Sequence, residues 1–303
     1  MSQRQTGPGL AAAAFSFLCW GMLPLYWRLL DGVAALEISC HRVVWSGALT
    51  GALLLALGRM GEVRKALANR RDLGLLAVSS AMIGVNWVLY IWAVNNGHVL
   101  DASLGYYLNP LVNVVLGMAV FRERLNRPQA VAVGLAACGV AVQLAGAGNL
   151  PWIALSLAVS FGIYGMVRKL AAVESLPGLF VETACLGLPA AGYLLWRGAQ
   201  GLGGMGGGGL MQDALLVGAG AVTTLPLLTF AFGARRISLT TLGVLQYISP
   251  TGMFVLGILV YGEPLGLARA ATFGLIWAGV ALYTVDGAMR LRGLARRPDA
   301  ASS

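Results

Sequence analysis

The chain has 303 residues, of which 58% are hydrophobic and 11% are charged, and its formal net charge is +9 at pH 7. Soluble domains carry about 25% charged residues, so this composition excludes an ordinary water-facing surface. Most of the Lys and Arg residues lie in alternate connections between apolar runs, which is typical of membrane orientation signals and does not indicate nucleic-acid binding.

Apolar runs, each long enough for one membrane-spanning helix, follow one another along the chain. The ten runs cover residues 10–30, 36–57, 73–94, 104–121, 128–146, 150–167, 178–196, 213–233, 241–261 and 269–286. The segment 1–9 is too short for a signal peptide, so we expect the first run to be retained as a helix. The sequence predicts an all-α membrane protein with a cytoplasmic N-terminus at 1–9 and a basic cytoplasmic tail at 288–303.

Aromatic and amide side chains occur well inside the first and third apolar runs. Trp20 lies in the first run, and Asn86, Trp87 and Tyr90 lie close together in the third. An amide among aromatic rings suits the stacking of an organic substrate, whereas the alternative is an aromatic belt at the membrane interface. We take these four residues as candidates for the wall of a substrate cavity.

Ionisable residues also lie inside the predicted spans: Glu37, His41 and Arg42 in the second run and Glu182 in the seventh. Each charged group costs about 2.5–3.5 kcal/mol at the centre of a spanning helix on insertion scales. Glu37 and His41 are four residues apart and share a helix face. These four residues are candidates for proton or charge coupling. The alternatives are that Glu37 favours the positive end of its helix and that Arg42 extends to the interface.

An internal repeat relates the two halves of the chain. When the chain is aligned with itself, identical residues match in one register without a gap: Tyr107 with Tyr247, Pro110 with Pro250, and Gly117 with Gly257. Upstream, a slightly longer offset brings Glu182 onto His41. Because five spans per half is an odd number, the second half must be inverted. The sequence therefore predicts two inverted five-helix repeats, at 10–146 and 150–287, which is typical of secondary transporters.

The paired prolines, Pro110 and Pro250, lie inside apolar runs, where each would remove a backbone hydrogen bond. In lipid the freed carbonyl must face protein or a wet cavity. Amide and phenol side chains surround these prolines: Tyr107, Asn109, Asn113, Gln246 and Tyr247. We expect broken helices whose polar side chains line the cavity. The alternative is that the prolines only kink the helices while the amides bind neighbouring helices.

Cofactor and metal motifs are missing from the sequence. The four cysteines are isolated within apolar runs, and the two histidines form no metal-binding spacing. The glycine-rich segment 201–209 lacks the Lys-Ser/Thr ending of a phosphate-binding loop, so we expect a flexible outer linker. The sequence therefore predicts no cofactor and no metal site.

A resemblance to the RarD-type branch of the EamA-like family, in the drug/metabolite transporter superfamily, is carried by "CWGMLPLYWRLL", "EISCHRVVWS" and "NWVLYIWAVNNGHVLDASLGYYLNPLVNVVLGMAVFRERL". It extends over about residues 10–286. The resemblance implies ten transmembrane helices in two inverted repeats and an inner-membrane permease that acts as an exporter. The characteristic polar positions of the branch fall on Glu37, His41, Arg42, Trp45, Asn86, Trp87, Asn109, Asn113 and Glu182. The glycine-rich linker departs from the family pattern, and we expect it to touch none of these positions.

The sequence thus predicts a multi-pass transporter of the inner (plasma) membrane. It would move a small organic metabolite or drug by alternating access, with protons as a candidate coupling ion. One alternative is a carrier or flippase for lipid-linked molecules. Another is an intramembrane enzyme, although no HExxH motif or Ser/His arrangement is present. The predicted partners are the substrate and the lipid bilayer, and the oligomeric state is left open.

Overall fold

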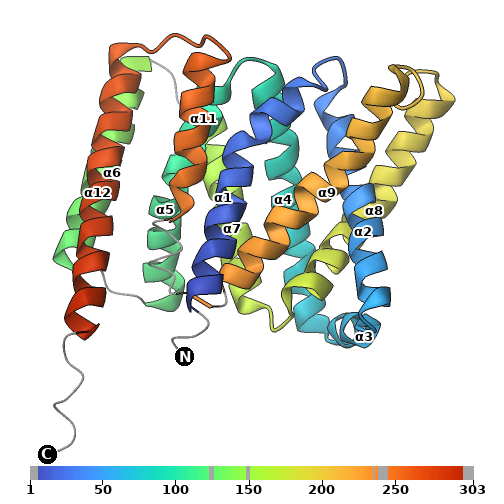
Figure 1. Cartoon of the computed structure of the whole chain (residues 1–303), viewed down its shortest axis with the longest axis horizontal. Coiled ribbons are helices and arrows are strands. Elements are labelled where there is room, and N and C mark those ends of the chain that lie inside the picture. Colours follow the sequence, from blue (N-terminus) through green and yellow to red (C-terminus); the bar gives the residue numbers. More distant parts are fainter. Residues whose placement is uncertain (1–5, 123–125, 148–150, 235, 238–244, 296–303) are drawn as a thin grey trace, which may run out of the picture.

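The described part of the chain is built from helices alone in this computed structural model, which describes residues 6–122, 126–147, 151–234, 236–237 and 245–295. Figure 1 shows the helices standing side by side. The eleven helices of the described residues are α1 (Thr6–Arg28), α2 (Ala35–Ala56), α3 (Met60–Ala68), α4 (Arg70–Asn95), α5 (Val99–Phe121), α6 (Arg127–Ala147), α7 (Trp152–Leu170), α8 (Ser175–Ala199), α9 (Gly209–Ala234), α11 (Ile248–Leu259) and α12 (Leu267–Ala295).

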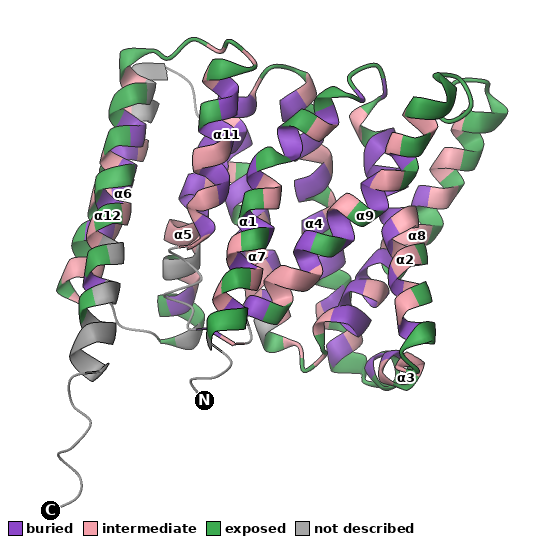
Figure 2. Ribbon diagram, in the orientation of Figure 1, coloured by how far each residue is buried: buried purple, intermediate pink, exposed green. Residues whose placement is uncertain are grey.

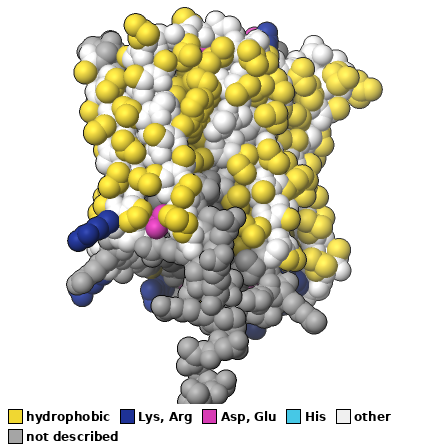
Figure 3. Space-filling view, turned by 60° about the vertical axis from the view of Figure 1, so that its left-hand side comes forward, with side chains coloured by type: hydrophobic (Ala, Val, Ile, Leu, Met, Phe, Trp, Pro, Cys, Tyr) yellow, Lys and Arg dark blue, Asp and Glu magenta, His cyan; other side chains and the backbone are white. Residues whose placement is uncertain are grey.

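The outer surface of the helices is apolar. Among the described residues, six helices are long and apolar enough to cross a membrane, and four further apolar helices are shorter. Figure 2 shows exposed residues along the whole length of the helices, and Figure 3 shows hydrophobic side chains covering most of one face. Leu188 and Leu267 are 85% and 91% exposed. Such a surface suits contact with lipid, in agreement with the predicted multi-pass helical membrane protein.

The short helix α3 was not predicted, because its residues form a charged connection between two apolar runs of the sequence. Val63 and Ala66 are buried on one side of this helix. Arg59 bonds to Glu62 at 2.7 Å and to Glu174 at 3.2 Å, which ties α3 to the start of α8. The bond from Arg59 also lowers the pKa of the Glu62 carboxyl. Apolar residues spaced three apart among charges are typical of such a surface helix.

Helix α5 begins at Val99, although the predicted span begins only at residue 104. The Glu263 carboxylate accepts hydrogen bonds from the backbone amides of Val99, at 2.8 Å, and Leu100, at 3.1 Å. These amides have no partner within the helix, and a carboxylate is favourable at a helix N-terminus. A residue from the other half of the chain therefore stabilises this end of α5.

The two paired prolines differ in their surroundings. Pro110 lies inside α5, which continues past it. Pro250 is the third residue of α11, which begins at Ile248. In the first turn of a helix the missing N–H would have no partner in any case. A turn at Tyr247 separates the helical residues 245–246 from α11, so the expected break lies beside Pro250. Helix α5 is continuous at Pro110, so the expectation of two equivalent breaks is wrong there.

Close helix crossings depend on small residues. Helix α1 packs on α9 and α11, α7 packs on α4 and α5, α2 packs on α8 and α9, and α6 packs on α12. At the α1–α11 crossing, a Cβ added to Gly252 would lie 3.3 Å from the Cα of Gly21. At the α6–α12 crossing, a Cβ on Gly139 would lie 3.0 Å from the carbonyl of Thr272. Small residues let backbones approach in this way in membrane proteins.

Candidate functional site

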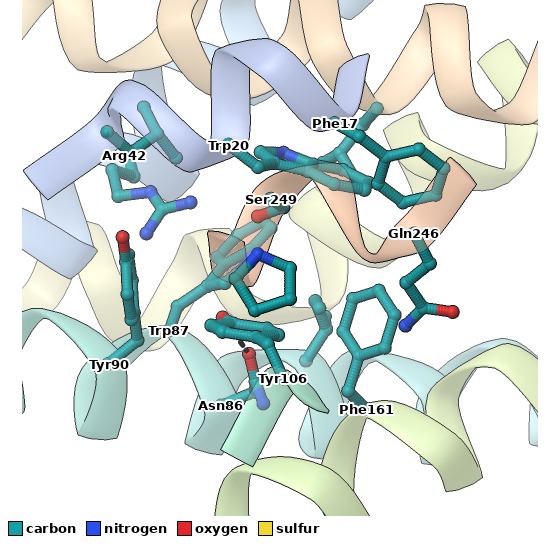
Figure 4. A pocket seen from close by; sticks show the side chains of 14 residues that line it. Phe17, Trp20, Arg42, Asn86, Trp87, Tyr90, Tyr106, Phe161, Gln246 and Ser249 are labelled. Carbon is teal, nitrogen blue, oxygen red and sulfur yellow. Dashed lines mark hydrogen bonds between the residues drawn. The ribbon is translucent and has the colours of Figure 1, made fainter. Parts of the chain in front are cut away.

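A pocket lies between the helices near the middle of the bundle. Its empty volume, which includes the opening to solvent, is about 570 Å³. Helices α1, α2, α4, α5, α7, α9 and α11 all contribute side chains to its wall. Figure 4 shows aromatic rings around the space, with a few polar groups directed into it. The polar side chains of the wall are Arg42, Asn86, Gln246 and Ser249. A largely apolar wall with few polar groups is typical of a site for a small organic molecule.

The aromatic wall is assembled by contacts between helices that are distant in sequence. Trp20 of α1 meets Phe161 of α7 edge to face, with ring centroids 6.2 Å apart. Phe161 in turn meets Tyr106 of α5 at 6.2 Å, and Tyr106 meets Tyr90 of α4 at 5.6 Å. Edge-to-face contacts at these separations are favourable for aromatic pairs. The wall is therefore continuous across four helices.

Asn86 joins α4 to α7 beneath this wall. Its side-chain amide donates to the carbonyl of Leu157 and to the hydroxyl of Ser160, both at 3.0 Å. Its amide oxygen accepts a hydrogen bond of 3.4 Å from the Tyr106 hydroxyl (Figure 4). Asn86 therefore has protein partners on both sides of its amide, and it positions the Tyr106 ring as well as lining the pocket.

Arg42 enters the pocket from α2 and is only 3% exposed (Figure 4). Its Nε donates to the Thr223 hydroxyl at 2.9 Å. Its Cζ lies 4.5 Å from the centroid of the Trp87 ring and 4.7 Å from that of Trp27. Among the described residues its Nη1 has no hydrogen-bond partner, and no carboxylate lies within ion-pair distance of the guanidinium.

The positive charge of Arg42 is thus only partly compensated. Each cation–π contact contributes about 0.5–2 kcal/mol. Burying an ion in a protein carries an effective penalty of several kcal/mol, even after relaxation. The two indole faces and one hydroxyl therefore leave a buried cation with a free donor at the wall of the pocket.

Glu37 lies outside the pocket and is paired at one end of the α2–α8 contact. It accepts a hydrogen bond of 3.1 Å from Arg197 and another from the backbone amide of Gly204. The expectation that the glycine-rich linker touches none of the predicted positions is therefore wrong. A glycine suits this place because a Cβ on Gly204 would lie 3.3 Å from the Glu37 carboxylate and 3.1 Å from Val33.

His41 also lies outside the pocket wall. Its Nδ1 accepts a hydrogen bond of 3.3 Å from the indole N–H of Trp45, one turn along α2. Glu37, which shares the His41 face in the sequence pattern, bonds to Arg197 instead. The two residues therefore have separate partners, and only Arg42 of this group reaches the pocket.

Glu182 lies at another buried ion pair, away from the pocket wall. Its Oε1 accepts a hydrogen bond of 2.5 Å from the Ser79 hydroxyl, and it lies 3.4 Å from Nε of Arg168. A Cβ on Gly178 would overlap the guanidinium of Arg168, so glycine leaves room for this pair. The contacts join α4, α7 and α8, and they give Glu182 a position between helices.

The predicted candidates divide between the pocket and the surrounding helix contacts. Those that line it are Trp20, Arg42, Asn86, Trp87, Tyr90, Gln246 and Pro250, whereas Tyr107, Asn109, Pro110 and Tyr247 do not. Tyr107 bonds to Thr251 at 2.8 Å and to the Trp277 indole at 2.7 Å. Asn109 is fully buried, and its amide has no hydrogen-bond partner among the described residues. The side chain of Asn113 lies outside the described part of the chain.

Several residues of the wall were not predicted from the sequence. Phe17, Tyr106 and Phe161 supply aromatic surface, and Thr223 holds Arg42 from behind the wall. The alignment of the two halves, which places Trp20 on Phe161, contained a signal for the latter, because equivalent positions of a repeat face the same cavity. No comparable signal distinguished Tyr106 from Tyr107.

An apolar exterior and an internal, largely aromatic pocket are typical of a multi-pass membrane transporter. A model of the EamA-like transporter family matches residues 7–145. Protein RarD of Streptomyces exfoliatus is 45% identical over 301 residues, covering 99% of this chain and 96% of that protein. Protein RarD of Salmonella typhi is 46% identical over 286 residues, covering 94% and 97%. The chain therefore belongs to the EamA-like transporter family, in its RarD branch.

A solved crystal structure has the same fold. It superposes with a TM-score of 0.63 at 20% sequence identity, covering 91% of this chain and 97% of that one. The prediction of a transporter of this family, and not an enzyme, is confirmed by the relatives.

Proposed function

We propose that this protein is a secondary transporter of the bacterial plasma membrane that exports a small organic molecule by alternating access. One observation carries the proposal: side chains from helices of both predicted repeats line the same pocket. Helices α1, α2, α4 and α5 contribute from the first repeat, and α7, α9 and α11 contribute from the second. A substrate site between two repeats can be exposed to each side in turn when the repeats rock against each other.

The inverted repeats at 10–146 and 150–287 are part of this proposal, and the helix contacts support them. Helix α1 packs on α9, and the helices that correspond to these two, α7 and α4, also pack on each other. The α1–α11 crossing at Gly21 and Gly252 has a counterpart in the α5–α7 crossing, where Val112 contacts Gly162. In the alignment of the two halves, Gly21 matches Gly162 and Gly252 matches Val112. Such paired contacts are expected of two halves related by a pseudo-twofold axis.

The orientation in the membrane follows from the basic residues. In Figure 1 the start of α1, the end of α12 and the helix α3 lie on the same side of the bundle. Helix α3 carries Arg64 and Lys65, and a basic side of a membrane protein faces the cytoplasm. We therefore assign this side, with both termini, to the cytoplasm.

The pocket supports an organic substrate with an apolar or aromatic part, because rings make up most of its wall. In this proposal, movement of the substrate is coupled to the movement of protons. Glu37 and Glu182 would act through the helix contacts that they hold, since neither lines the pocket. Protonation of either carboxylate would weaken its arginine contact and so shift the balance between two arrangements of the helices.

The test uses purified protein in sealed vesicles that are given a mixed pool of metabolites and drugs, with and without an imposed proton gradient. Mass spectrometry of the vesicle contents identifies what moves. We expect one class of compound to accumulate only under the gradient. Accumulation to equilibrium alone would replace the proton-coupled carrier with a facilitator. Movement of no compound relative to empty vesicles would reject the transporter of small organic molecules.

A further inference from the structure

We propose that the pocket binds a small organic anion whose carboxylate, or a similar group, pairs with the guanidinium of Arg42. The apolar part of the anion would lie against the aromatic wall formed by Trp20, Tyr106 and Phe161. This inference rests on the proposed function, because it assigns the substrate class of the same pocket.

The first argument is charge. Arg42 is buried in the wall, yet no carboxylate of the described residues forms an ion pair with it. The titratable groups that face it are the phenols of Tyr90 and Tyr106. The buried carboxylates Glu37 and Glu182 each have an arginine of their own. Arg42 is therefore a buried charge of the pocket wall that has no counter-charge among the described residues, and a bound anion would supply one.

The second argument is the fixed geometry of the guanidinium. Thr223 holds Nε at 2.9 Å, and the indole rings of Trp27 and Trp87 hold the planar group between α1 and α4. Nη1 has no partner among the described residues and is free to donate. A guanidinium that is held in place pairs with a planar carboxylate through parallel hydrogen bonds and loses little freedom in doing so.

The third argument concerns the other possible ligands. A cationic ligand would be repelled by Arg42, and a neutral apolar ligand would leave the Nη1 donor without a partner. An inorganic anion could pair with the guanidinium but would leave the surrounding rings unused. An organic anion both pairs with the guanidinium and packs against the aromatic rings, so it fits the pocket better than these three kinds of ligand.

The test compares three probes that share one ring: phenylacetate, phenylacetamide and phenethylammonium. Acetate and chloride serve as anions without a ring. Binding to the purified full-length protein is measured by tryptophan fluorescence and by ligand-induced thermal stabilisation. We expect phenylacetate to bind at least about tenfold more tightly than the amide, because charge-assisted pairs are roughly twice as strong as neutral hydrogen bonds. The ammonium probe should bind most weakly.

Variants assign the preference to one side chain. Arg42→Gln should remove the preference for phenylacetate over phenylacetamide, whereas Arg42→Lys should retain part of it because the charge remains. Arg64→Gln removes an arginine from the exposed surface of α3 and should leave the preference unchanged. If Arg42→Gln does not fold, the probe series on the unsubstituted protein and on Arg42→Lys still decides the question.

The outcomes separate this inference from the proposed function. Equal binding of all three probes, binding of none, or protection by acetate or chloride equal to that by phenylacetate would overturn the organic-anion site. Vesicle transport of neutral or cationic compounds that is unchanged in Arg42→Gln would overturn it and leave the transporter intact. Selective binding of phenylacetate with no transport of any compound would support the site and reject the proposed function.

Discussion

The Glu182–Arg168 pair offers the clearest test of how buried charge holds this bundle together. Two unit charges at the observed 3.4 Å attract by about 5 kcal/mol at an effective dielectric constant of about 20. The Arg168 side chain retains 15% of its exposure, so solvent screens part of this attraction. We expect a coupling energy of about 2–4 kcal/mol between the two side chains, which is in the range for breaking a buried pair.

A double-mutant cycle measures this coupling directly. It compares the free energy of unfolding of the unsubstituted protein, Glu182→Gln, Arg168→Gln and the double variant in mixed detergent micelles. Each single variant should be strongly destabilised, because the remaining partner is left buried without its counter-charge. The double variant should lose much less than the sum of the two.

The control cycle uses Arg59 and Glu62, whose side chains are 34% and 36% exposed. Their coupling should be much smaller, because exposed pairs are screened. If the coupling of Glu182 with Arg168 is no larger than that of this control, the pair does not hold α7 and α8 together and the argument from burial fails.

Three other perturbations follow from the helix contacts. Gly139→Leu should lower the free energy of unfolding by about 1–3 kcal/mol through overpacking at the α6–α12 crossing. Gly134→Leu is the control, because a Cβ at Gly134 would have no neighbouring atom within 4 Å, and it should leave the free energy of unfolding almost unchanged in the same micelle assay. Glu37→Gln should speed hydrogen exchange at the Gly204 amide by about tenfold or more, since a hydrogen bond to a charged group contributes about 1.5–3 kcal/mol. Unchanged exchange would show that the glycine-rich linker is held in place without the Glu37 carboxylate. Asn86→Leu should cost about 2 kcal/mol, because three interhelical hydrogen bonds of about 0.6 kcal/mol each are lost and the remaining partners are left unpaired. Thermal melting in detergent tests this, and no loss would contradict it.

The spanning helices could be predicted from the sequence because each requires about 20 apolar residues in one run. Their ends could not be predicted as well. The start of α5 depends on Glu263, which caps the amides of Val99 and Leu100 from the other half of the chain. The short helix α3 was missed because its pattern covers only two turns within a charged connection.

The pocket was predicted only in part because lipid-facing and protein-facing positions are both apolar. Successive residues of a helix point about 100° apart. Tyr106 therefore lines the pocket, while the adjacent Tyr107 bonds to Thr251 and Trp277 on another side of α5. Hydrophobic periodicity identifies the buried face of a helix in water but distinguishes the faces poorly in a membrane. The choice of Tyr107 over Tyr106 could not be corrected without the positions of the neighbouring helices.

The ionisable residues were located correctly inside the spans, but only their partners distinguish their roles. Glu37 and Glu182 are each neutralised by an arginine of a neighbouring helix, so removing either carboxylate should first change how α8 packs. Arg42 is held by indole rings and a hydroxyl, which orient its charge without neutralising it. A buried charge that is held in place without a counter-charge among the described residues stabilises the folded bundle poorly, since no ion pair there offsets the cost of its desolvation. Such an arrangement is instead suited to a ligand that brings the opposite charge with it, and for that reason the substrate class can be argued from Arg42 and not from either glutamate.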